Sequence, residues 1–201
     1  MVSLSNKILN INTLINKIFS LKKNKMRVGL CHGVFDLVHI GHIQHFIEAK
    51  KYCDILCVTI TEDKYVSKSL NKPVFDQNVR SNFLSSLEII DYVAINKWSN
   101  AINTINYLKP NFYIKGSDYK LAKNDLTKKI QLEREIAKKN NCKVIFTNTP
   151  LQSSTKILNN HTDLVYNTEQ KKFLNNVKNL TNFNLIQEYF KKIEKIRSTV
   201  I

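Results

Sequence analysis

Glycine is scarce in this sequence, and several signatures of nucleic-acid binding are missing with it. The chain has four glycines in 201 residues and contains no RGG repeat, zinc knuckle or aromatic RNP pattern. Acidic residues are also few: 16 Asp and Glu stand against 31 Lys and Arg, which gives a formal net charge of +15. Such a charge suits anionic small substrates as well as nucleic acid. Because Asn and Lys are abundant throughout the chain, we expect no nucleic-acid partner.

Long apolar runs are absent too. No run approaches the ~20 apolar residues that a membrane-spanning helix needs. Residues 1–21 alternate polar and apolar positions at helical spacing and carry no small-residue cleavage site, so they predict an amphipathic helix and not a signal peptide. The sequence therefore predicts a cytoplasmic protein with no membrane partner.

Cysteine is equally sparse, at four residues, and no two of them form a CxxC pair. All four fall in or beside segments that are expected to be buried: Cys31, Cys53, Cys57 and Cys142. We therefore expect free thiols of a reducing compartment. The spacing supports no zinc site, and we predict no metal-ligating residues.

The chain does contain a regular alternation of apolar strand-like runs and amphipathic helical patterns. The expected strands are residues 26–31, 54–61, 91–96, 111–115 and 143–147. The expected helices between them are residues 43–52, 77–87, 99–108 and 124–140. This alternation predicts an α/β fold, a doubly wound five-stranded parallel sheet with helices on both faces.

This pattern predicts three regions along the chain. Residues 1–25 hold an N-terminal helix, residues 26–158 hold the α/β domain, and residues 159–201 form a helical C-terminal extension without strands. The extension ends on an apolar pair without a cap, which suggests a linker to a further domain. Ligands of parallel sheets bind beyond the carboxyl ends of the strands, so the residues that follow each strand are the candidates for chemistry.

One stretch carries most of these candidates: residues 30–42, with the sequence LCHGVFDLVHIGH. It joins the first expected strand to the first expected helix, and Gly33 and Gly41 suit the turn between them. This layout aims backbone N–H groups at the space beyond the strand end, where anions bind well. His39 and His42 lie three residues apart at the helix entrance and can face one cavity. His45, three residues further on, is expected on the helix surface.

The pattern Gly33-x-Phe35-Asp36-x-x-His39-x-Gly41-His42 resembles the HxGH signature of the cytidylyltransferase-like nucleotidyltransferases. That family includes glycerol-3-phosphate cytidylyltransferases and the adenylyltransferase domain of heptose-nucleotide synthesis. The resemblance covers residues 27–158. It implies a Rossmann-like fold, Mg²⁺ with CTP or ATP as co-substrate, and a homodimer.

The reaction that the resemblance implies is nucleotidyl transfer. A phosphate oxygen of a sugar or polyol phosphate attacks the α-phosphorus of a nucleoside triphosphate, and pyrophosphate leaves. A phosphate monoester is already largely ionised at neutral pH, because its second pKa is about 6, so no strong general base is required. The protein must instead bring two anions together and neutralise charge on the leaving oxygens.

The resemblance also gives roles to single residues. The expected catalytic residues are His39, His42, Lys68 and Arg80. The expected nucleotide-binding residues are Gly33, Val34, Phe35, Asp36, Gly41, Lys115, Gly116, Asp118, Ser153, Ser154 and Thr155. The expected acceptor-binding residues are Asp63 and Lys72. For three residues a second interpretation stays open: core packing for Phe35, orientation of the turn or Mg²⁺ binding for Asp36, and helix capping for Asp63.

The donor nucleotide is less well determined. Residues 114–119 look more like the heptose branch of the family, whereas Lys156 and Ile157 match the glycerol branch. Residues 148–152, NTPLQ, replace the family's Arg-Thr-Glu-Gly-Ile, and the arginine is missing. We expect a CMP transfer from CTP to a sugar or polyol phosphate, with an ATP-dependent adenylyltransferase acting on a heptose phosphate as the alternative. Two alternatives of other classes are a non-catalytic nucleotide-binding regulatory domain and a nucleic-acid binder that uses the basic C-terminal helices.

Overall fold

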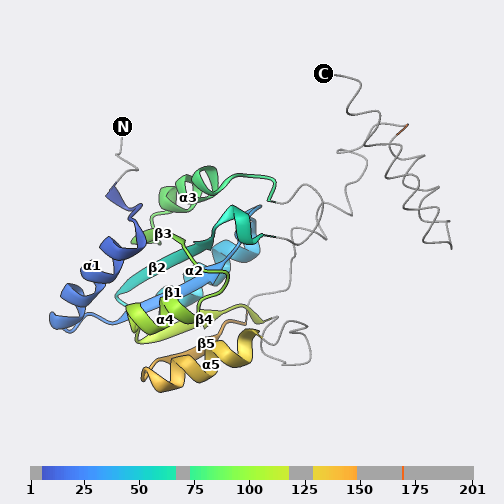
Figure 1. Cartoon of the computed structure of the whole chain (residues 1–201). Helices are drawn as coiled ribbons and strands as arrows, with labels where there is room; N and C mark the ends of the chain where they lie inside the picture. The colour runs from blue at the N-terminus through green and yellow to red at the C-terminus, as the bar shows by residue number, and fades with distance from the viewer. Residues whose placement is uncertain (1–5, 67–72, 118–128, 149–168, 170–201) are drawn as a thin grey trace. The chain divides into compact units, whose positions relative to one another are not determined.

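Five strands of the described residues pair in parallel into one sheet, in the order β3-β2-β1-β4-β5 (Figure 1). They are β1 Val28–Gly33, β2 Ile55–Thr61, β3 Tyr92–Asn96, β4 Phe112–Lys115 and β5 Lys143–Phe146. Leu30 of β1 lies between Cys57 of β2 and Tyr113 of β4. The order reverses between β1 and β4, which is where doubly wound sheets bind ligands. The predicted parallel sheet is confirmed.

The structure, a computed structural model of the whole chain, describes residues 6–66, 73–117, 129–148 and 169. Chain contacts divide the protein into two units, Met1–Gln152 and Ser153–Ile201. All described residues except Glu169 belong to the first unit. The predicted boundary at residue 158 and the helical extension therefore lie outside the described residues and stay predictions.

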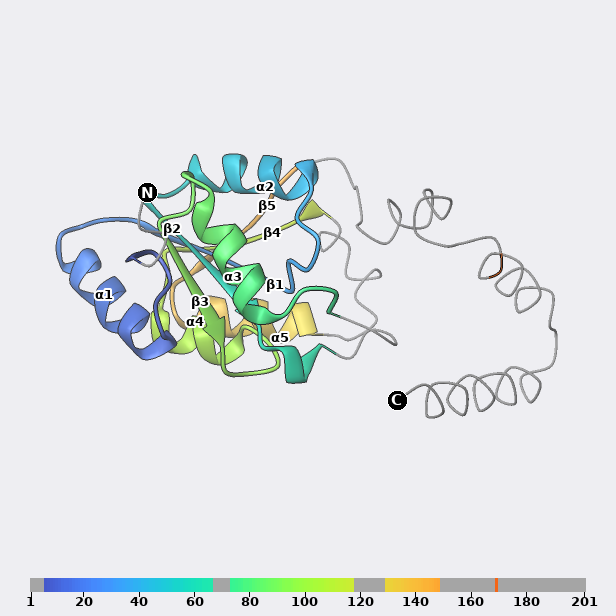
Figure 2. The ribbon, with the colours of Figure 1, turned by 90° about the horizontal axis from the view of Figure 1, so that it is seen from above.

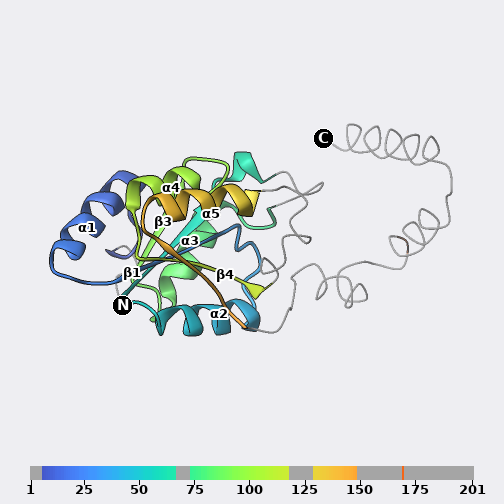
Figure 3. The ribbon, with the colours of Figure 1, turned by 90° about the horizontal axis from the view of Figure 1, so that it is seen from below.

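Helices cover both faces of the sheet, as predicted (Figures 2 and 3). They are α1 Ile11–Lys23, α2 Ile40–Lys50, α3 Gln77–Ser86, α4 Ile102–Leu108 and α5 Lys129–Lys139, with a short 3-10 helix, η2, at Asp63–Tyr65. α2 and α3 pack on one face, around a cluster that contains Phe46, Leu56 and Leu84. α1, α4 and α5 pack on the other face.

The N-terminal helix is built into the sheet domain. Ile11, Leu14 and Ile18 are buried in the same cluster as Val28 and Leu30 of β1. The segment before α1 also joins the outer edge of the sheet, because Ile8 forms a parallel bridge with Val93 of β3. The described residues before β1, from position 6 onward, thus belong to the sheet domain.

Two helix starts differ from their predicted positions. α2 begins at Ile40, three residues before the expected position 43, because the side chain of His39 caps it. α4 begins at Ile102 and not directly after Ser99, the expected cap, and Ala101 stands at its N-cap without a side-chain hydrogen bond. The Asn100 side-chain oxygen accepts from the Ile102 N–H instead, at 3.0 Å.

All four cysteines are buried and free, as expected. Burial raises the pKa of Cys53 to about 11 and that of Cys142 to about 12, so both stay thiols at neutral pH. The described residues contain no group of three or more metal-ligating side chains. No described helix combines the length and the apolar character needed to cross a membrane.

Candidate active site

The N-terminus of α2 is capped by two histidines. His39 Nδ1 accepts a hydrogen bond from the Gly41 N–H at 3.1 Å, and His42 Nδ1 accepts one from the His39 N–H at 3.3 Å. The two rings lie with their centroids 4.1 Å apart. The first turn of this helix, which the structure describes in full, contains no acidic residue. The positive end of the helix is therefore open to an anion.

These hydrogen bonds fix where each imidazole carries its proton. A backbone N–H can only donate, so Nδ1 of His39 and Nδ1 of His42 must both be bare acceptors. In the neutral form the proton of each ring then sits on Nε2. The pair therefore presents two Nε2–H donors without carrying a positive charge of its own.

Burial keeps the pair neutral. It lowers the pKa of His42 to about 4, and the neighbouring His39 lowers it further in the same direction. The pKa of His39 is also lowered by burial. At neutral pH both rings are thus uncharged, and their approach to a polyphosphate would raise both pKa values again because an anion favours the protonated form.

Acid is expected to destabilise this end of the sheet. A histidine of the unfolded chain titrates near pKa 6.5, whereas burial lowers the pKa of both His42 and His45 to about 4. Between these values the unfolded state binds more protons, so the free energy of unfolding falls as the pH falls from 6.5 to about 4. For His45 the shift corresponds to about 3 kcal/mol.

Urea unfolding across this pH window measures the effect. Carboxylates titrate there too, so the control is His45→Asn, which removes one titrating group and should flatten the pH dependence. A variant whose pH dependence equals that of the wild type would contradict the assignment.

Phe35 packs in the core beside the histidine pair. Its ring lies 5.4 Å from the His42 ring in an edge-on arrangement and 5.3 Å from Phe46. A Cβ on Gly33 would meet the Phe35 ring at 3.1 Å, so Gly33 makes room for this ring. Phe35 has a φ of 50°, a backbone conformation that is costly outside glycine. The structure thus supports the packing interpretation of Phe35 and explains Gly33 by the same contact.

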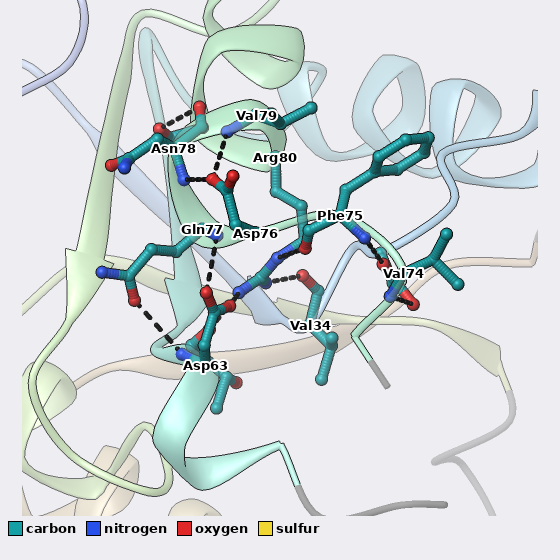
Figure 4. A network of polar contacts seen from close by, with 12 residues as sticks. Val34, Asp63, Val74, Phe75, Asp76, Gln77, Asn78, Val79 and Arg80 are labelled. Atoms are coloured by element: carbon teal, nitrogen blue, oxygen red, sulfur yellow. Dashed lines mark hydrogen bonds and ion pairs between the residues drawn. The ribbon is translucent and has the colours of Figure 1, made fainter. Parts of the chain in front are cut away.

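Asp36 fastens the turn after β1 to the segment before α3. Its two carboxylate oxygens accept hydrogen bonds from the N–H groups of Val74 (2.9 Å) and Phe75 (3.0 Å). Of the two interpretations of Asp36, the structure supports orientation of the turn, since both oxygens are already engaged. Figure 4 shows Val74 and Phe75 beside Arg80.

Arg80 is a buried clamp and not an exposed cation (Figure 4). Its side chain has an exposed fraction of 0%. Nε donates to the Phe75 carbonyl at 3.0 Å, and Nη2 donates to the Thr61 carbonyl at 2.8 Å. Nη1 donates to the Val34 carbonyl, and Nη2 also forms an ion pair with Asp63. Direct contact of Arg80 with a substrate stays a prediction; the role that these contacts support is to position the turns after β1 and β2.

Asp63 completes this clamp. One of its oxygens pairs with Arg80, and the other accepts from the Gln77 N–H at 3.0 Å at the start of α3. The Gln77 side chain accepts from the Asp63 N–H in return, at 3.2 Å. The N-cap of α3 is Asp76, so Asp63 contributes a second carboxylate at this helix start and is not its cap. Acceptor binding by Asp63 stays a prediction.

A second polar cluster lies at the end of β4. The Lys115 Nζ is 3.9 Å from the Glu133 carboxylate of α5, and both side chains are nearly covered. Glu133 also accepts from the Tyr113 hydroxyl at 2.7 Å and from the Ala101 N–H at 3.2 Å. Nucleotide binding by Lys115 and by the following Gly116 stays a prediction. Glu133 was not foreseen, because one acid in a charged amphipathic helix gives no sign that it is buried.

His45 corrects the prediction of a surface residue. It is 7% exposed, and its Nδ1 lies 2.9 Å from the hydroxyl of Thr147, the residue after β5. His32, another histidine near the motif, is also buried, with Nδ1 3.0 Å from the Thr59 hydroxyl in the neighbouring strand.

The structure thus brings together the strand-end residues of β1, β2 and β4 that the sequence predicted, together with the histidine pair. Val34 contributes its carbonyl to the Arg80 clamp and Gly41 contributes its N–H to the helix cap. Six predicted site residues lie outside the described residues: Lys68, Lys72, Asp118, Ser153, Ser154 and Thr155.

Comparisons with known proteins give relatives over about half of the chain. The bifunctional protein HldE of Campylobacter fetus is 36% identical over 106 residues, which are 50% of this chain and 23% of that protein. The bifunctional protein HldE of Nitratiruptor sp. is 33% identical over 117 residues, 56% of this chain and 25% of that protein. The aligned part therefore spans about a quarter of the length of these curated relatives.

Two solved structures share the fold. The lipopolysaccharide core biosynthesis protein of Thermoplasma volcanium has a TM-score of 0.53 and 27% identity, over 63% of this chain and 99% of that chain. The pantoate-beta-alanine ligase of Francisella tularensis has a TM-score of 0.55 and 15% identity, over 92% of this chain and 85% of that chain. At that identity the second likeness shows the fold alone.

The sequence profile of the cytidylyltransferase-like family matches residues 30–199. The match begins within β1 and includes the turn that carries both histidines. Because it extends over most of the sequence, the chain belongs to the cytidylyltransferase-like family of nucleotidyltransferases.

Proposed function

We propose that the chain transfers the adenylyl group of ATP to the phosphate of a sugar, forming an ADP-sugar and pyrophosphate. Three points support ATP over the CTP that the sequence first favoured. The relatives named HldE belong to the heptose branch of the family, and residues 114–119 resemble that branch as well. The arginine that accompanies the cytidylyl pattern is replaced by Asn148.

The observation that carries the proposal is the neutral histidine pair at the open N-terminus of α2. A phosphate oxygen of the acceptor attacks the α-phosphorus, the bond to the bridging oxygen breaks, and the electron pair leaves with pyrophosphate. The negative charge grows on oxygens, and two Nε2–H donors beside a helix N-terminus stabilise it. No proton has to leave the acceptor, since its phosphate is already ionised.

Mg²⁺ stays a prediction for this reaction. The carboxylate that the sequence offered for it, Asp36, has both oxygens engaged by backbone N–H groups. Among the described residues no three metal-ligating side chains gather, and the step above is derived from protein groups alone. The predicted homodimer and the cytoplasmic location likewise stay predictions.

The proposal is tested by incubating the protein with ATP or CTP, with and without Mg²⁺, and with a panel of aldose phosphates and glycerol 3-phosphate. We expect pyrophosphate to be released with ATP and an aldose phosphate. Release with CTP but not with ATP would support CTP as the donor. No release from any combination would contradict nucleotidyl transfer. Tight nucleotide binding in calorimetry without any turnover would favour the non-catalytic regulatory domain.

A further inference from the structure

A buried hydrogen-bonded chain links α2 to the ends of β4 and β5. His45 Nδ1 lies 2.9 Å from the Thr147 hydroxyl oxygen. Thr147, which is fully buried, directs its N–H (3.0 Å) and its hydroxyl (3.3 Å) to the Lys115 carbonyl. One side chain of the helix is therefore tied to two neighbouring strand ends through a single threonine.

The same hydrogen bond sets His45 apart from the other two histidines. His39 and His42 direct Nδ1 to backbone N–H groups at the start of their own helix, whereas His45 directs Nδ1 to a side-chain hydroxyl after β5. A hydroxyl can donate or accept, so either neutral tautomer of His45 keeps this bond. His45 thus lies in a contact between elements and not at the helix cap, which indicates a different role.

A second side chain of α2 strengthens the same link. Glu48, one turn after His45, accepts from the Asn148 N–H at 3.0 and 3.2 Å through its two oxygens. Two residues one turn apart on the helix therefore hold two consecutive residues after β5. Since α2 also carries the histidine pair, the position of that pair relative to the ends of β4 and β5 depends on this link.

The surroundings of His45 keep its ring neutral. His42 on α2 and Lys115 on β4 are the titratable groups that act on it, and Thr147 after β5 is uncharged. Burial, and then these two neighbours, lower the pKa of His45 to about 4. The ring stays neutral at physiological pH, so His45 itself does not compete with the histidine pair for an anion.

We propose that His45 is a positioning residue for nucleotidyl transfer, which acts through Thr147 to hold the His39/His42 pair against the ends of β4 and β5. The inference rests on the proposed function. A shift of a donor pair by a fraction of an ångström weakens stabilisation of the transition state more than it weakens binding of the nucleotide. The signature of this role is a loss in kcat at nearly constant KM.

Four variants separate the hydrogen bond from packing. His45→Leu and Thr147→Val each remove one partner of the His45–Thr147 hydrogen bond, whereas His45→Asn keeps a polar group near the position of Nδ1 and Thr147→Ser keeps the hydroxyl. We expect kcat to fall about tenfold in each of the first two variants, with no further loss in the double variant. His45→Asn and Thr147→Ser should retain most of the wild-type kcat. Ile47→Ala, at an exposed position of the same helix, is the control.

Two measurements keep this inference separate from the proposed function. Thermal unfolding shows whether a variant loses only stability: a lowered Tm with unchanged kcat per folded molecule would overturn the positioning role. If the wild type shows no turnover, NMR of the ring nitrogens takes over. We then expect Thr147→Val to shift the ring signals of both His45 and His42; unchanged His42 signals would overturn the link.

Discussion

Replacing His39 by Asn is expected to lower kcat by at least ~10²-fold while the protein stays folded, because loss of a donor to a developing oxyanion costs that much. Asn is among the best N-cap residues, so its side-chain oxygen can accept from the Gly41 N–H in place of His39 Nδ1. It has no group at the position of the imidazole Nε2–H. The variant therefore removes the proposed chemistry and keeps the cap, and pyrophosphate release measures the result.

His39→Gln is the matched control, because glutamine keeps a donor and loses the helix cap. Its amide can present an N–H near the position of Nε2, but it is a poor cap, so we expect a loss of about 1 kcal/mol in unfolding free energy. It should keep more turnover than His39→Asn. If the two variants had the same kcat, the Nε2–H of His39 would have no part in the transition state.

Replacing Arg80 by Met is expected to cause the largest loss of stability, about 3 kcal/mol, because it strands a partly covered carboxylate and three backbone carbonyls without their donor. The carbonyls belong to Val34, Thr61 and Phe75, and the carboxylate belongs to Asp63. Met is apolar and unbranched, so it can occupy part of the space. Urea unfolding at neutral pH measures the change.

Arg27→Met is the control for a lost arginine ion pair. Arg27 pairs with Asp54 at 3.1 Å, but its side chain is 55% exposed. Exposed pairs contribute little to stability, so we expect a much smaller loss than in Arg80→Met. An equal loss in both variants would mean that the covered clamp of Arg80 contributes no more than a surface pair.

The strands were the easiest elements to predict. Residues 54–61 form a nearly continuous apolar run, and the observed strand, Ile55–Thr61, differs from the prediction by one residue. A strand that is buried on both faces of a sheet has such a run of apolar residues. Helix starts were harder. The sequence placed His39 and His42 at the helix entrance, but histidine is not among the preferred caps, so the helix was expected to begin only at residue 43.

The roles of single polar residues depended on contacts that sequence spacing does not contain. The partner of His45, Thr147, is 102 residues away, so its burial follows from how β5 packs and not from its place on the helix. The same holds for Arg80, whose partners come from three different turns. A motif identifies such residues as important, but only the fold tells whether they contact a substrate or hold the groups that do.

The short segment before α1 has a consequence for how copies of this protein meet in solution. β3 is the outermost strand on its side of the sheet, and the N–H and carbonyl of Val93 are taken up by Lys7 and Leu9 at 2.9 Å each. An outer strand with vacant hydrogen-bonding groups is a template on which a foreign strand can add. Residues 7–9 occupy the first part of that template, at Val93, and thereby oppose growth of sheets from edge to edge on this side, and the aggregates that result.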